Sequence, residues 1–157
     1  MIKDKTPDTK DKLVWKWLKG QTTTKAEFGD PIASAVYKLC IYSGATEDLV
    51  SQAVVPSGTL WKAISNKGYK YKDKFGTSDG VTKVVLKGKG ANKSKALVKG
   101  KGVNVDIPPD ASDSMKELDL PVRVQLVNGD NGICFEADYQ IGDIKKNVPG
   151  KFKAKAQ

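Results

Sequence analysis

The chain of 157 residues contains no histidine, a single arginine and two cysteines. Without histidine it cannot form a Ser-His-Asp or Cys-His catalytic arrangement, and two thiols alone do not make an ordinary zinc site. No apolar run approaches the roughly 18 residues of a membrane-spanning helix. No long stretch has the periodicity of an amphipathic helix either. These absences argue against most hydrolytic chemistry and against a helical fold.

Short alternating segments dominate what remains. Fifteen glycines and seven prolines separate runs in which apolar and polar residues alternate, the pattern of half-buried strands. We predict one all-β domain over residues 12–157, an antiparallel β-sandwich or jelly-roll-like fold of roughly nine to eleven short strands. Residues 1–11 are charged, polar and interrupted by Pro7, so we expect a flexible lead or linker there.

The clearest pattern is a β-hairpin between residues 119 and 139. Val122, Val124 and Leu126 alternate with polar neighbours, and the alternation resumes at Ile133 after residues 128–132, Asn-Gly-Asp-Asn-Gly. Such residues tolerate the positive φ angles of tight turns. The same turn, and the loop 108–113, offer oxygens to a structural calcium ion. Because turns use these side chains for their own backbone, we predict no metal or cofactor.

Cys40 and Cys134 lie in two segments that both read as strands, residues 37–42 and 133–138. If the two cysteines were opposite each other in antiparallel register, Lys38 would face Glu136, which is a favourable pair. We therefore expect a Cys40–Cys134 disulfide and, with it, a secreted or extracellular setting. Two free thiols are the alternative.

Aromatic residues suggest a binding surface. Tyr69 and Tyr71 alternate with lysines, and together with Trp61 they could form an exposed strip that stacks on sugar rings. The same strip could stack nucleic-acid bases. The plainer interpretation is that these rings belong to the core.

The net charge of +9 comes almost entirely from lysine. Arginine is the residue that reads phosphate and guanine bidentately, and lysines on strands also keep sheet edges solvated. We therefore expect solvated faces and no nucleic-acid partner, with a polyanion site as the alternative.

Two further features have a functional interpretation. Leu13, Trp15 and Trp17 line one face of the first predicted strand, which could be donated to a neighbouring copy and build a fibre; an ordinary first strand is the alternative. Glu136 and Asp138 share one face of a strand, as a glycosidase pair could. Such a pair needs a deep cleft, so we predict no enzyme.

Several phrases together carry a family resemblance. They are Lys-Leu-Val-Trp-Lys-Trp at 12–17, Phe-Gly-Asp-Pro at 28–31, Tyr-Lys-Leu-Cys-Ile-Tyr at 37–42, Gly-Tyr-Lys-Tyr-Lys-Asp-Lys at 68–74, Gly-Val-Thr-Lys-Val-Val-Leu-Lys at 80–87, Lys-Gly-Lys-Gly-Val-Asn at 99–104, Pro-Val-Arg-Val-Gln-Leu-Val-Asn at 121–128 and Ile-Cys-Phe-Glu-Ala at 133–137. From residue 12 to residue 155 the chain resembles an uncharacterised β-rich domain at the ends of large secreted proteins of myxobacteria and related deltaproteobacteria. The resemblance implies an exported, modular context and assigns no functional residue.

The sequence thus predicts a non-catalytic extracellular module, structural or interaction-mediating, in a cell-surface or secreted assembly. Its partners would be other domains or copies of the same protein. A carbohydrate-binding module that uses Trp61, Tyr69 and Tyr71 is the alternative.

Overall fold

A computed structural model describes residues 1–108 and 115–156. Its described part contains twelve strands and three short 3₁₀ turns. The strands are β1 (Ile2–Lys3), β2 (Lys12–Gly20), β3 (Tyr37–Ser43), β4 (Asp48–Val55), β5 (Trp61–Ala63), β6 (Gly68–Lys72), β7 (Val81–Lys87), β8 (Ser94–Lys101), β9 (Val122–Asn128), β10 (Cys134–Tyr139), β11 (Ile144–Val148) and β12 (Lys151–Ala154). The 3₁₀ turns are η1 (Asp8–Lys10), η2 (Ala26–Phe28) and η3 (Ile141–Asp143). None of the helical segments among the described residues has the length and apolarity needed to cross a membrane.

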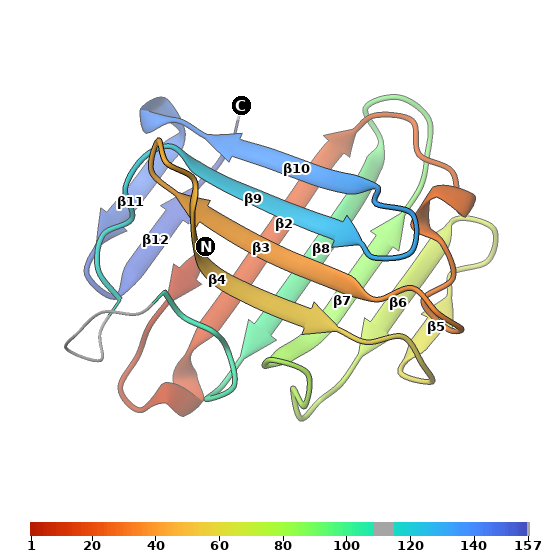
Figure 1. Cartoon of the computed structure of the whole chain (residues 1–157), viewed down its shortest axis with the longest axis horizontal. Coiled ribbons are helices and arrows are strands. Elements are labelled where there is room, and N and C mark those ends of the chain that lie inside the picture. Colours follow the sequence, from red (N-terminus) through yellow and green to blue (C-terminus); the bar gives the residue numbers. More distant parts are fainter. Residues whose placement is uncertain (109–114, 157) are drawn as a thin grey trace.

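Two antiparallel sheets pack face to face, which confirms the predicted β-sandwich (Figure 1). The larger sheet has eight strands in the order β11-β12-β1-β2-β8-β7-β6-β5, and the smaller has four in the order β10-β9-β3-β4. The hairpin at residues 119–139 is present as β9 and β10. Its alternation was interpreted correctly, since Val122, Val124 and Leu126 are buried between the sheets.

The core is built from the inward residues of both sheets. Tyr37 and Trp61 pack with ring centroids 5.6 Å apart, and Trp61 packs on Tyr71 at 5.4 Å. Phe28 and Phe135 form a second aromatic contact at 5.4 Å. Burying each such ring removes some 150–250 Å² of surface from water. The Tyr37–Trp61 contact joins β3 of the smaller sheet to β5 of the larger one.

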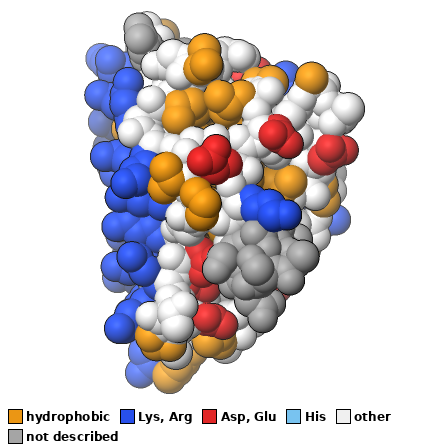
Figure 2. Space-filling view, turned by 90° about the vertical axis from the view of Figure 1, so that its left-hand side faces the viewer, with side chains coloured by type: hydrophobic (Ala, Val, Ile, Leu, Met, Phe, Trp, Pro, Cys, Tyr) orange, Lys and Arg blue, Asp and Glu red, His pale blue; other side chains and the backbone are white. Residues whose placement is uncertain are grey.

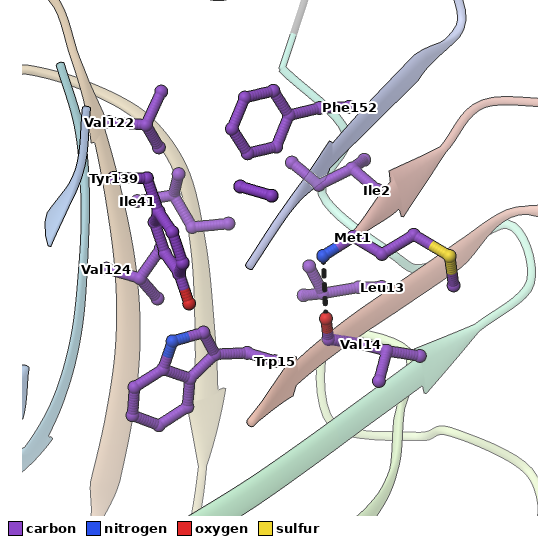
Figure 3. A pocket seen from close by; sticks show the side chains of 11 residues that line it. Met1, Ile2, Leu13, Val14, Trp15, Ile41, Val122, Val124, Tyr139 and Phe152 are labelled. Atoms are coloured by element: carbon purple, nitrogen blue, oxygen red, sulfur yellow. Dashed lines mark hydrogen bonds between the residues drawn. The ribbon is translucent and has the colours of Figure 1, made fainter. Parts of the chain in front are cut away.

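The first eleven residues do not form the flexible lead that their composition predicts. β1 lies between β12 and β2, with Ile2 opposite both Phe152 and Leu13. Ile2 is buried, and the nitrogen of Met1 donates to the carbonyl oxygen of Val14 at 2.8 Å (Figure 3). One apolar residue in a polar stretch is enough to anchor the segment, because its side chain fills a place in the core.

A small cavity adjoins this anchor. It measures ≈20 Å³ and is lined by Ile2, Leu13, Trp15, Tyr139 and other side chains of the two sheets (Figure 3). That is room for about one water molecule. This cavity is therefore too small to hold a substrate.

Carboxylates close one edge of the smaller sheet. On the edge strand β4, the backbone N–H groups of Gln52 and Val54 have no strand partner in the described part of the chain. They donate to the side chains of Asp106 and Asp79, at 2.6 Å and 2.7 Å. An edge strand with unpaired N–H groups can pair with a strand of another chain. These two N–H groups are already hydrogen-bonded, so they are not available for such pairing.

Candidate anion-binding face

Lysines cover the outer face of the eight-stranded sheet. Its strands contain sixteen of them and no aspartate or glutamate: Lys3; Lys12, Lys16 and Lys19; Lys62; Lys70 and Lys72; Lys83 and Lys87; Lys95, Lys99 and Lys101; Lys145 and Lys146; Lys151 and Lys153. Figure 2 shows the result as an almost continuous blue band along one side of the molecule. We call the outward surface of this sheet the lysine face.

The local reason for this surface is the period of a strand. Successive side chains point to opposite faces, so an alternating segment such as Tyr69-Lys70-Tyr71-Lys72 sends its rings inward and its ammonium groups outward. The same alternation recurs in β2, where Leu13 and Trp15 are buried and Lys12 and Lys16 are exposed.

The sheet register places many of these lysines directly opposite one another. Eight cross-strand pairs join lysine to lysine: Lys3 with Lys151, Lys3 with Lys12, Lys12 with Lys101, Lys146 with Lys153, Lys62 with Lys70, Lys72 with Lys83, Lys83 with Lys99 and Lys87 with Lys95. Like charges in this arrangement destabilise a sheet. The fold tolerates this repulsion because its core supplies the stability.

No carboxylate neutralises the face within the described residues. Every side-chain ion pair found there involves Arg123, which lies on β9 of the other sheet. Arg123 is 2.8 Å from Glu47, 2.7 Å from Asp138 and 3.9 Å from Glu136. The hydrogen bond and charge of Asp138 raise the pKa of the guanidinium. Glu136 and Asp138, the carboxylates considered as a glycosidase pair, are thus part of an ion-pair cluster around Arg123. Among the described residues the ion pairs therefore lie around β9 of the smaller sheet, and the lysines of the larger sheet take part in none of them.

Between the lysines, the face is apolar and without aromatic rings among the described strands. Val14, Val85 and Leu97 are half-buried and sit in the middle of the face. Leu18 on β2, 58% exposed, is the one large apolar side chain of these described strands that is mostly exposed. The arrangement therefore offers many ammonium donors on a broad surface, and no ring on which a sugar or a base could stack.

The predicted aromatic strip does not exist. Trp61, Tyr69 and Tyr71 are on the inner side of the larger sheet, with exposures of 2%, 7% and 0%. Trp61 donates its indole N–H to the carbonyl of Pro56 at 2.8 Å, and the ammonium of Lys25 lies 4.9 Å from the ring centroid of Tyr69. The predicted alternation of Tyr and Lys is correct. The lysines face water and the tyrosines are buried, because the second sheet covers the side on which the tyrosines lie.

The predicted disulfide is also wrong. Both cysteines are free, Cys40 buried and Cys134 exposed. β9 lies between their strands, so Cys40 is opposite Gln125 and Cys134 is opposite Val127. Burial, the charge of Glu136 and the neighbouring Cys40 raise the pKa of Cys134. Because strands two places apart in a sheet are about 10 Å apart, the sulfurs cannot bond without moving the backbone.

The strand proposed for donation lies inside its own sheet. β2 pairs with β1 on one side and β8 on the other, and Leu13 and Trp15 are buried in the core. Trp17 packs on Phe135 with ring centroids 5.3 Å apart. Donating this segment would break two ladders and open the core.

The turn oxygens that could hold calcium have other partners. The side chain of Asn128 accepts from the backbone N–H of Asp130, and that of Asn131 accepts from Ile133, at 2.9 Å and 3.0 Å. Asp130 accepts from the hydroxyl of Ser34 at 2.5 Å. Of the other candidate loop, residues 109–114 lie outside the described part of the chain.

The sequence interpretation gave a polyanion site only as the alternative to solvated faces, and it did not predict that the lysines gather on one face. The signal for this face was available, since the segments YKYK, KGKG and KFKAK place lysines at every second position without an acidic residue. Comparison with protein-family models, with curated proteins and with solved structures finds no match to this chain. Its function must therefore be argued from this surface.

Proposed function

We propose that this protein is a non-catalytic binding module that holds an acidic polysaccharide on its lysine face, within a cell-surface or secreted assembly. The observation that carries the proposal is the eight-stranded sheet with sixteen lysines and no acidic residue. The extracellular setting rests on the family resemblance alone, because the cysteines are unpaired and give it no support.

The geometry of the face favours a linear polymer. Lys151, Lys3, Lys12 and Lys101 follow one another across four neighbouring strands, β12, β1, β2 and β8. Neighbouring strands are about 4.8 Å apart, which is close to the length of one sugar residue in an extended chain. A polymer with one charge on each sugar could therefore meet one lysine per strand.

The two other classes of polyanion fit this face less well. Sequence-specific nucleic-acid readers use arginine and stacking rings, and the outward positions of these strands hold neither. Proteins that bind anionic membranes add apolar side chains that enter the bilayer. Here Val14, Val85 and Leu97 are half-buried, and Leu18 at 58% is the one large apolar side chain of these described strands that is mostly exposed. The face therefore offers little apolar surface to a bilayer.

Self-assembly through the first strand is not favoured, because β2 is paired on both sides. Attachment of one copy's lysine face to the opposite face of another is not favoured either. The strands of the smaller sheet carry three carboxylates, and two of them are engaged with Arg123. That is too little negative charge to match sixteen lysines.

The test is a comparison of three polyanions at equal ionic strength: polygalacturonate, a DNA duplex and vesicles containing phosphatidylserine. We expect polygalacturonate to bind most tightly, with an affinity that falls as salt rises. Lys83→Gln with Lys99→Gln removes a directly opposed pair from the centre of the face and should weaken binding. Lys38→Gln, on the smaller sheet, should not. Tighter binding of DNA or vesicles, or no binding at all, would refute the proposal.

A further inference from the structure

One part of the lysine face is hollowed. A surface hollow of ≈280 Å³ is lined by five lysines, Lys3, Lys5, Lys10, Lys12 and Lys101. It lies where β1, β2 and β8 meet the segment that joins β1 to β2. Its volume equals that of about nine water molecules in the liquid, enough for a charged substituent and part of the sugar that bears it.

The fold brings these five side chains together from three strands and a loop. Lys3, Lys12 and Lys101 are successive cross-strand neighbours. The loop is folded back by Asp11, whose side chain accepts the backbone N–H of Lys5 at 2.7 Å and whose carbonyl accepts that of Gly102 at 3.1 Å. Lys5 and Lys10 are thereby held at the rim of the hollow.

The aspartates of this loop leave the hollow positive. Asp4 accepts the backbone N–H of Met115 at 2.6 Å, Asp11 is buried, and Asp8 is exposed in η1. No carboxylate among the described residues is within ion-pair distance of a lysine of the hollow, since the ion pairs all involve Arg123. Burial and the charges of Lys3, Lys146, Lys153 and Lys5 lower the pKa of neighbouring Lys151, as expected in a positive field.

We propose that this hollow binds an ester-linked sulfate or phosphate group of the polysaccharide. A tetrahedral ester group presents three terminal oxygens in different directions, whereas a carboxylate presents two in one plane. Each ammonium offers three donors, so five lysines around one hollow suit the ester group better. The inference rests on the proposed function and narrows it: the partner is a sulfated or phosphorylated polysaccharide rather than one that carries carboxylates alone.

Two matched double variants test this inference. Lys12→Gln with Lys101→Gln removes a directly opposed pair that lines the hollow. Lys62→Gln with Lys70→Gln removes a directly opposed pair at the far edge of the same face. Each variant loses two positive charges. The hollow variant removes two repulsive pairs, because Lys12 is opposite both Lys101 and Lys3, and the edge variant removes one. Both should therefore fold, which circular dichroism and urea unfolding verify.

Binding is measured to dextran sulfate, phosphorylated dextran and polygalacturonate at equal ionic strength. We expect the hollow variant to weaken binding to at least one of the two ester polymers by about tenfold more than the edge variant does. Polygalacturonate binding should fall equally in both variants. The ester polymer with the larger effect identifies the group.

Two results would overturn the inference in distinguishable ways. If the two variants weaken every polymer equally, the hollow has no preference, while binding by the face as a whole stands. If the unaltered protein binds none of the polymers, the proposed function fails together with the hollow.

Discussion

Lys12→Glu should stabilise the protein, and the reason lies in the sheet register. Lys12 is exposed on β2, with Lys3 opposite on one side and Lys101 opposite on the other. A glutamate there would turn two repulsive pairs into two attractive ones. Opposite-charge pairs across strands contribute about 0.2–1 kcal/mol each, so the free energy of unfolding should rise by about 0.4–2 kcal/mol. For a domain of this size, 1 kcal/mol raises Tm by about 2–4 °C.

The assay is urea unfolding at low and at near-physiological salt. The Debye length falls from about 30 Å at 0.01 M to about 8 Å at 0.15 M, so the stability gain of Lys12→Glu should shrink as salt is added. Over the same range, the unaltered protein should become more stable because its lysine–lysine repulsion is screened. The same variant should bind dextran sulfate more weakly, as expected where a repulsive surface is kept for function.

The control is Lys38→Glu, which makes the same charge change on β3. Lys38 is exposed and lies opposite Val54 and Val127, so no directly opposed lysine is relieved. It should give no comparable gain. If Lys12→Glu destabilises the protein, or if both variants gain equally at low salt, repulsion between opposed lysines is not a significant term in this fold.

Two further predictions concern acid stability and the thiols. Burial opposes the ionised form of Asp73, but hydrogen bonds from Thr77 and from the backbone N–H of Phe75 outweigh it and lower its pKa below the ordinary 3.8. The ionised Asp73 should therefore stabilise the fold above pH 3.8, and this contribution should be lost as the pH falls through the lowered pKa. At neutral pH, Asp73→Asn should lower the free energy of unfolding, measured in urea, by about 1–3 kcal/mol. An unchanged dependence of stability on pH below about pH 5 in Asp73→Asn would contradict this role. In the folded protein a thiol reagent should label Cys134 alone, more slowly than a free cysteine because its pKa is raised, and should reach buried Cys40 only in urea. A protein that remains unlabelled in urea until a reductant is added would indicate a disulfide and contradict the structure.

Which residues share a side of a strand could be read from the sequence. The alternation in residues 122–126 predicted one face of the hairpin, and the spacing of Leu13, Trp15 and Trp17 predicted one face of the first long strand. A period of two is a property of the backbone and needs no neighbour. The same period also separates Tyr69 and Tyr71 from the lysines beside them.

Which side faces water, and which strands become neighbours, was decided only by the tertiary structure. Tyr69 is buried because a second sheet covers its side, and the cysteines are apart because β9 enters between β3 and β10. The hollow forms because Lys12 lies opposite Lys3 on one side and Lys101 on the other. The alternation within a single strand does not determine which strands lie next to it. The sequence by itself therefore determined strands in which lysines alternate with buried residues, and the order of strands assembled those lysines into one face.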